Sequence, residues 1–257
     1  NLPLLQPTNL KDETFLAELK AWNANLQIVV AFRMLPEVVW KMPKLGTFNL
    51  HASLLPNYRG AAPINWAIIN GDAKTGVTTF FIDDKIDTGA MILSAETEID
   101  PNENAGLLHD RLMRLGSETV IETLNLIENG NVNATIQEEN AEIKTAYKLN
   151  KENCKIDWTQ SAREIFNLIR GLSPYPSAWC IFQDKNEEWS VKIHEAKMVL
   201  ENHNFESGSL ICSKKEMKIA VKDGFIQVIS LQFPGKKKMN VGELLNGMTF
   251  SDNAKVV

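Results

Sequence analysis

The chain has 257 residues, with 44% hydrophobic and 23% charged side chains and a formal net charge of −5. This length allows one large domain or two modest ones with buried cores, and the composition is that of an ordinary globular protein. The net negative charge argues against a dedicated nucleic-acid coat protein. No apolar run approaches the roughly 18 residues that are needed to span a bilayer. The N-terminus lacks the basic start and apolar stretch that are typical of a secretory signal.

In the first half, short apolar runs rich in β-branched residues alternate with helical patterns, which predicts an α/β fold with a parallel sheet. Asp12 is the expected N-cap of the first helix, and Gly130 the expected end of a long amphipathic one. The expected strands are 26–32, 47–52, 76–83 and 89–99. The expected helices are 12–23, 36–42, 62–70 and 103–128.

The second half has a different pattern. Residues 132–148 are polar and weakly periodic, so we expect a linker. One helix at 161–172 follows, and then short alternating strands that predict a small antiparallel barrel or sandwich. These strands are expected at 177–182, 190–199, 208–213, 217–223 and 224–233.

Three cysteines, Cys154, Cys180 and Cys212, stand far apart in the sequence. Their number is odd and no CxxC pair occurs, which argues against a zinc ribbon. We therefore expect free, buried thiols in a reducing, cytoplasmic setting.

Asn49 and His51 stand two residues apart in the strand expected at 47–52. Because side chains alternate along a strand, both point to one face and Leu50 points to the other. An imidazole can move a proton near neutral pH, and an amide can donate to an oxygen on which charge develops. The pair suits chemistry at a carbonyl, although a purely structural role for such a pair is the commoner case.

A carboxylate that orients the imidazole is expected in "IDDKIDTGAM", where Asp87 is the best candidate. One helix and one strand separate this loop from His51. In an α/β sheet that spacing can bring two loops to the same edge, where ligands gather. The alternative carboxylates that could anchor the imidazole are Asp83 and Asp84, unless these are solvated residues of a turn.

The remaining motifs are weak taken singly. "SLLPNYRG" either grips a planar heterocycle through its backbone or turns the chain, and "AFRMLP" closes the preceding strand at the same edge. His109, His194 and His203 are expected to be surface or packing residues. The sequence has no GxGxxG, P-loop or HExxH motif and no evident metal-ligand cluster.

In combination, "FNLHASLLPNYRGAAPINWAIINGD" and "TGVTTFFIDDKIDTGAMIL" resemble the folate-dependent formyltransferases, which move a formyl group from 10-formyltetrahydrofolate to an amine. The resemblance implies a Rossmann-like domain with Asn49, His51 and Asp87 as the catalytic trio. It also implies two folate-contacting segments, a turn and the loop beside the pterin. Their residues are Ser53, Leu54, Leu55 and Pro56 in the turn, and Arg33, Met34 and Leu35 in the loop.

The stretches "AYKLNKENCKIDWTQSAREIFNLIRGLSPYPSAW" and "LQFPGKKKMNVGELLNG" resemble the branch of this family that formylates methionyl initiator tRNA. In that branch a small C-terminal OB-like β-barrel helps to hold the acceptor arm. The resemblance implies a catalytic domain at 1–131, the linker at 132–148 and the barrel at 149–257. Phosphate contacts are expected at Arg170, Lys236, Lys237 and Lys238, unless "GKKK" is a solvated hairpin tip.

We therefore expect a cytoplasmic, monomeric bacterial transferase of translation initiation, with folate and initiator methionyl-tRNA as partners and with no metal or membrane. Two alternatives stay open: another amine acceptor, such as a sugar nucleotide or purine precursor, and a non-catalytic tRNA-binding remnant. Family members begin with a strand–loop–helix unit and a basic inserted loop, and this sequence starts beyond both. The resemblance thus implies a longer gene product or a truncated chain.

Overall fold

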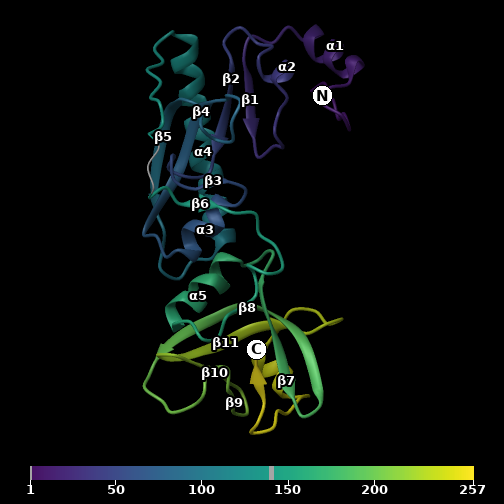
Figure 1. The fold of residues 1–257 in the computed structure, drawn as a ribbon, viewed down its shortest axis with the longest axis vertical. Coiled ribbons are helices and arrows are strands. Elements are labelled where there is room, and N and C mark those ends of the chain that lie inside the picture. The colour runs from purple at the N-terminus through teal and green to yellow at the C-terminus, as the bar shows by residue number, and fades with distance from the viewer. Residues whose placement is uncertain (1, 139–141) are drawn as a thin grey trace. The chain divides into compact units, whose positions relative to one another are not determined.

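Two sheets hold most of the strands in the computed structural model, which describes residues 2–138 and 142–257 (Figure 1). The chain divides into two units, each assembled from segments that are separate in sequence. The first comprises Asn1–Pro63, Thr75–Thr97 and Arg111–Ala146, and the second comprises Ile64–Lys74, Glu98–Asp110 and Tyr147–Val257.

The sheet of the first unit has the strand order β1-β2-β4-β5. Its strands are β1 at Gln27–Val30, β2 at Thr47–His51, β4 at Lys74–Phe81 and β5 at Met91–Glu98. The expected parallel pairing is found between β1 and β2, whereas β4 runs antiparallel to β2, so the sheet is mixed. Phe48, Val77 and Phe80 are at most 2% exposed and form its core. The predicted α/β class is confirmed.

Residues 2–138 contain four helices: α1 at Glu13–Ala21, α2 at Glu37–Trp40, α3 at Pro63–Ile69 and α4 at Ala105–Glu128. Asp12 caps α1 as predicted, because its carboxylate accepts a hydrogen bond from the Phe15 N–H. Among the described residues, none of the helices combines the length and the apolar character that a bilayer crossing requires.

Leu50 of β2 packs against α4. A Cβ on Gly116 of α4 would lie 2.8 Å from Leu50 Cδ2, so the absence of a side chain at Gly116 allows this close approach. Because side chains alternate along β2, the residues on either side of Leu50 project from the opposite face of the sheet. That face carries the candidate site.

A short parallel pair joins the loop after β2 to the segment that follows α4. It consists of β3 (Arg59–Gly60) and β6 (Thr145–Ala146). Nearby, Thr135 forms an isolated bridge with Met91 at the start of β5. Part of the segment expected to be a linker is thus paired with the first unit at two places.

Within residues 142–257 the second sheet has seven antiparallel strands in the order β13-β7-β8-β11-β10-β9, with β12 on β11. The strands are β7 at Ala178–Asp184, β8 at Glu187–Leu200, β9 at Leu210–Cys212, β10 at Met217–Val221, β11 at Gly224–Gln232, β12 at Met239–Asn240 and β13 at Lys255–Val256. A bridge between Ser209 and Lys255 brings the two sheet edges together. The predicted antiparallel barrel is therefore confirmed, and it is nearly closed.

Two helices accompany the barrel, α5 at Ala162–Gly171 and α6 at Val241–Leu245. Ile165 and Ile169 of α5 belong to the barrel's hydrophobic core. As predicted, the three cysteines are free thiols: Cys154 and Cys180 are buried and Cys212 is partly buried. Burial raises the pKa of the Cys212 thiol to about 11.

Candidate active site

Asn49 and His51 project from the same face of β2, as the strand period predicts. Asn49 is paired with Val29 of β1 on one side and Phe80 of β4 on the other, so it lies inside the sheet rather than at its edge. His51 is buried, with 7% of its surface exposed, and Asn49 is partly exposed. The imidazole is thus held in place while the amide remains accessible.

The two ring nitrogens of His51 face different groups. Nε2 lies 2.8 Å from the carbonyl oxygen of Tyr58, and Nδ1 lies 3.8 Å from Oδ2 of Asp87. A backbone carbonyl only accepts hydrogen bonds, so Nε2 carries the hydrogen. In the neutral ring, Nδ1 is then the nitrogen that can take up a proton, and a proton there lies next to a carboxylate.

Asp87 is held from two directions. Its Oδ2 accepts a hydrogen bond of 2.8 Å from the Gly60 N–H, and its backbone carbonyl accepts one of 2.9 Å from the side chain of Gln137. Its φ of 55° lies in the left-handed region, which is uncommon for a residue other than glycine. The structure thus brings the loop of Asp87 to His51, as the sequence analysis expected.

The alternative anchor, Asp83, is occupied within its own turn, where it accepts hydrogen bonds from Thr88 Oγ1 and the Lys85 N–H. Asp84 is exposed. Both aspartates therefore fit the turn interpretation, and Asp87 is the carboxylate that faces the imidazole.

The turn at Ser53–Pro56 is anchored to β4. Thr78 is fully buried, and its hydroxyl donates to the Ser53 carbonyl at 2.8 Å and accepts from the Leu55 N–H at 3.2 Å. Ser53 Oγ in turn donates to the Asn57 carbonyl at 2.6 Å. Since Thr78 is the register partner of His51, this turn is fixed directly beside the imidazole.

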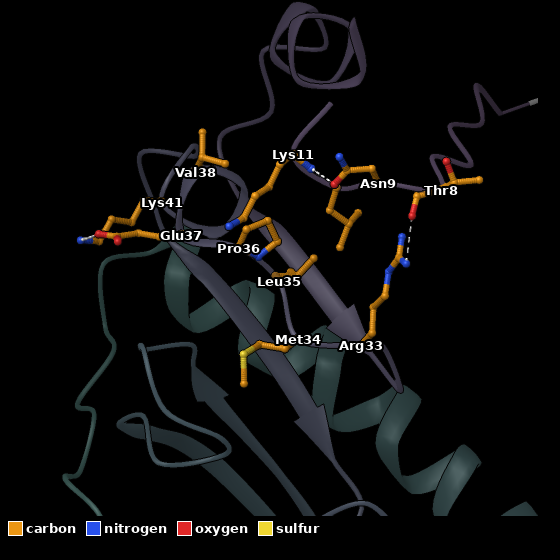
Figure 2. Close-up of a pocket in the computed structure, with 11 residues that line it drawn as sticks. Thr8, Asn9, Lys11, Arg33, Met34, Leu35, Pro36, Glu37, Val38 and Lys41 are labelled. Carbon is orange, nitrogen blue, oxygen red and sulfur yellow. Dashed lines mark hydrogen bonds and ion pairs between the residues drawn. The ribbon is translucent and has the colours of Figure 1, made fainter. Parts of the chain in front are cut away.

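The loop after β1 lines an open cleft of about 1020 Å³ (Figure 2). Arg33, Met34 and Leu35, the loop residues expected to border the folate, lie on its wall together with Thr8–Lys11. Figure 2 shows the Arg33 guanidinium reaching the backbone carbonyl of Thr8, at 3.3 Å. The lining does not include Asn49, His51 or Asp87.

Gln137 is a site residue that the sequence analysis missed. It lies in the segment expected to be a linker, yet it is only 6% exposed and it contacts Asp87 and Arg59. Its immediate neighbours Ile136 and Glu138 are exposed, so no periodic pattern marks it. A glutamine between two exposed residues gives no sequence signal of burial.

Among residues 2–138 and 142–257, no group of three or more His, Cys, Asp or Glu side chains is placed to hold a metal ion. The other three histidines have local contacts. His109 is exposed beside Asp110, and Nδ1 of His194 lies 3.2 Å from Ser177 Oγ. His203 contacts the backbone carbonyls of Val221 and Gly224.

Comparison with known proteins covers nearly the whole chain. Residues 2–124 match the family model described as formyl transferase, and residues 148–249 match the one described as formyl transferase, C-terminal domain. A methionyl-tRNA formyltransferase of Flavobacterium johnsoniae is 78% identical over 256 residues, which cover 100% of this chain and 81% of that protein. One from Bacteroides thetaiotaomicron is 52% identical over 261 residues, with the same two coverages. The chain belongs to the methionyl-tRNA formyltransferase family.

Solved structures with the same fold include a tetrahydrofolate-bound protein and a sugar formyl transferase. HypX of Aquifex aeolicus in complex with tetrahydrofolic acid superimposes with a TM-score of 0.66 at 22% identity, covering 90% of this chain and 39% of that one. The sugar 3N-formyl transferase WlaRD gives a TM-score of 0.61 at 23% identity, covering 85% and 77%. At these identities the likeness concerns the fold alone.

The residues expected to contact tRNA in a methionyl-tRNA formyltransferase have different surroundings. Lys236, Lys237 and Lys238 are exposed in the turn between β11 and β12. Arg170, in contrast, is 8% exposed, and its guanidinium donates to Asn167 Oδ1 and to the Glu103 carbonyl. The side chain of Arg170 is thus buried, and its Nε and Nη1 donate within the protein, so a phosphate contact at Arg170 stays a prediction.

Proposed function

We propose that this chain transfers the formyl group of 10-formyltetrahydrofolate to the α-amino group of methionyl initiator tRNA, in translation initiation. The observation that carries the proposal is the 78% identity, over the whole chain, with a relative that bears the name of this activity. The cluster of Asn49, His51 and Asp87 supports it with chemistry suited to a carbonyl.

Asn49 is the proposed donor to the formyl oxygen. When bound, the folate supplies a formyl carbon that the amine nitrogen attacks, and negative charge develops on the formyl oxygen. The side-chain NH₂ of Asn49 donates to that oxygen from a fixed strand. A preorganised donor of this kind contributes about 3–4 kcal/mol, or about 10²–10³ in rate.

His51 and Asp87 handle the proton. Nε2 of His51 is tied to the Tyr58 carbonyl, so Nδ1 is assigned as the reactive nitrogen. At 3.8 Å its contact with Asp87 is longer than a hydrogen bond, and a proton on Nδ1 remains available to the reacting groups. The net reaction forms the C–N bond to methionine and breaks the C–N bond to folate. One proton passes from the amine to the departing nitrogen.

The proposed folate-binding site lies in the first unit. The cleft beside Arg33, Met34 and Leu35 has a volume of about 1020 Å³, at the upper end of the range typical of small-molecule sites. The turn at Ser53–Pro56 is held beside His51 by its two hydrogen bonds with the Thr78 hydroxyl. We propose that both segments contact the folate. No metal is invoked, because the formyl donor is already activated.

The proposed tRNA contact lies on the barrel unit, at the exposed Lys236, Lys237 and Lys238. Three ammonium groups on one turn suit the phosphate backbone of an acceptor arm, and such contacts release counterions and depend on salt. Arg170 is left out of this surface because it is buried.

A formylation assay tests the proposed function. The protein is incubated with 10-formyltetrahydrofolate and one of three acceptors: methionyl initiator tRNA, an amino-sugar nucleotide or glycinamide ribonucleotide. We expect formyl-methionyl-tRNA as the product, and none with His51→Ala. Formylation of only a small-molecule amine would assign a different acceptor, and tRNA binding with neither folate binding nor turnover would indicate a non-catalytic protein.

A further inference from the structure

Gln137 uses every donor and acceptor of its side-chain amide. Nε2 donates to the backbone carbonyls of Asp87 at 2.9 Å and Gly89 at 2.8 Å. Oε1 accepts from Arg59 twice, from Nε at 3.0 Å and from Nη2 at 2.8 Å. A buried amide with four hydrogen bonds is fully satisfied and has one orientation, since rotating it by 180° would set donors against Arg59 and the acceptor against two carbonyls.

Together with the hydrogen bond from Gly60, these contacts hold Asp87 from two sides. Gly60, the chain neighbour of Arg59, donates its N–H to Oδ2 of Asp87. Gln137 therefore reaches the carboxylate on one side through Arg59 and Gly60, and holds the backbone of Asp87 on the other. The left-handed φ of 55° at Asp87 costs energy that the surrounding contacts must offset, and the amide of Gln137 is one of those contacts.

We infer that Gln137 is a positioning residue: it holds Asp87 in the conformation in which the carboxylate faces Nδ1 of His51. The inference rests on the proposed function, because the trio of Asn49, His51 and Asp87 is taken as catalytic. Gln137 does not touch the reacting groups itself. Its effect passes through Asp87.

The chemistry of the position is specific. A glutamate at 137 keeps an acceptor for Arg59 but sets a carboxylate against the carbonyls of Asp87 and Gly89, which also only accept. An asparagine keeps the amide but is one methylene shorter and cannot span from Arg59 to both carbonyls. Gln137→Glu and Gln137→Asn thus remove the same contact in two different ways, so the test does not depend on a single variant folding.

The first measurement is the steady-state kinetics of formyl transfer by the purified protein. We expect both variants to lower kcat by about 10- to 100-fold, the cost of a small misplacement of a catalytic group, with the KM values for folate and tRNA changed by less than about threefold. Glu138→Gln is the matched control, an exposed neighbour with the opposite charge change, and should keep the wild-type kcat. A kcat within twofold of wild type in both Gln137 variants would overturn the inference.

The second measurement asks whether the effect passes through Asp87. In single-turnover experiments, Gln137→Asn should lower the rate of the wild type by about 10-fold or more, and the rate of the Asp87→Asn variant by less than about twofold. Equal losses in the two backgrounds would show that Gln137 acts elsewhere, and the inference would fail.

A third measurement does not depend on activity. The ¹⁵N signals of the two ring nitrogens of His51, assigned with His51→Gln, report which nitrogen carries the proton. We expect the Nδ1 signal to shift in Gln137→Glu, because the carboxylate beside it moves, and to stay unchanged in Glu138→Gln. If the His51 signals of Gln137→Glu equal those of the wild type, Gln137 does not position Asp87. Absence of formyl transfer by the wild type would instead refute the proposed function, and these spectra would still decide the role of Gln137.

Discussion

At the scale of single residues, a substitution of Asn49 tests the proposed stabilisation of charge on the formyl oxygen without removing the groups proposed to transfer the proton. Asn49→Ala removes the proposed donor to the formyl oxygen and leaves the contacts of His51 with Tyr58 and Asp87 in place. We expect the single-turnover rate to fall by about 10²–10³ while folate binding changes little. Asn131→Ala, an exposed asparagine, is the control. A rate within a few-fold of wild type would remove Asn49 from the catalytic trio.

The backbone conformation of Gly60 places its N–H against the carboxylate of Asp87. Its φ is +120°, a Cβ there would lie 2.5 Å from the Ala146 carbonyl oxygen, and its N–H binds Asp87. Gly60→Ala should therefore lower the free energy of unfolding by about 1–3 kcal/mol and also lower turnover, since the N–H leaves the carboxylate. Gly247→Ala is the matched control, because a Cβ at Gly247 meets no heavy atom within 4 Å. Equal unfolding midpoints in urea for the two variants would contradict this account.

The sequence predicts part of the site and misses the rest for a physical reason. Asn49 and His51 are detectable because a strand places alternate side chains on one face. Asp87 lies at the site although β4 runs antiparallel to β2, so the rule that loops of parallel strands meet at one edge does not account for its position. The partner of Nε2 is a backbone carbonyl, that of Tyr58, which every residue possesses. Gln137 comes from a polar stretch without periodicity. Groups that orient other groups leave little trace in a sequence.

At the scale of elements, periodicity locates helices and strands but not the direction in which neighbouring strands run. The strand expected at 76–83 is found as β4, yet it lies antiparallel to β2. Strand pairing depends on contacts distant in sequence, which apolar runs do not encode. The same holds for β3 and β6, whose two residues each are defined by their pairing. The capped helices, in contrast, are visible locally.

α5 provides a test of such a local signal. Ser161 and Glu164 form a capping box at its N-terminus, and hydrogen bonds from the Ser161 hydroxyl and N–H lower the pKa of the Glu164 carboxyl. Ser161→Ala should lower the free energy of unfolding by about 1 kcal/mol at pH 7. Ser190→Ala, an exposed serine of β8, should change it little.

The effect of the cap should depend on pH. A carboxyl whose pKa is lower in the folded state stabilises the protein above its unfolded pKa of about 4.3, and this contribution is lost as pH falls through the folded pKa. The difference between wild type and Ser161→Ala, measured by urea unfolding, should therefore be larger at pH 7 than at about pH 3.5. A difference that grows as pH falls would contradict the capping-box account.

At the scale of the whole molecule, the net charge of −5 opposes general attraction to a polyanion. A tRNA-binding member of this family then depends on local positive charge, and the turn of Lys236, Lys237 and Lys238 is an exposed example on the barrel unit. Affinity from a few local contacts should be modest and steeply dependent on salt, and it should depend on where the lysines stand rather than on how many the chain has.

Two triple lysine variants with the same change in net charge test whether the position of the lysines or their number governs tRNA binding. Replacing Lys236, Lys237 and Lys238 with alanine should weaken binding of initiator tRNA and lower the slope of log K against log[salt] by about 0.7–0.9 for each phosphate that the protein no longer neutralises. Replacing the exposed Lys214, Lys215 and Lys222 of other barrel turns lowers the net charge equally, and should leave the slope near that of the wild type. The measurement is a binding titration at several salt concentrations. Equal slopes in both variants would mean that overall charge governs binding, and the turn after β11 would lose its proposed role.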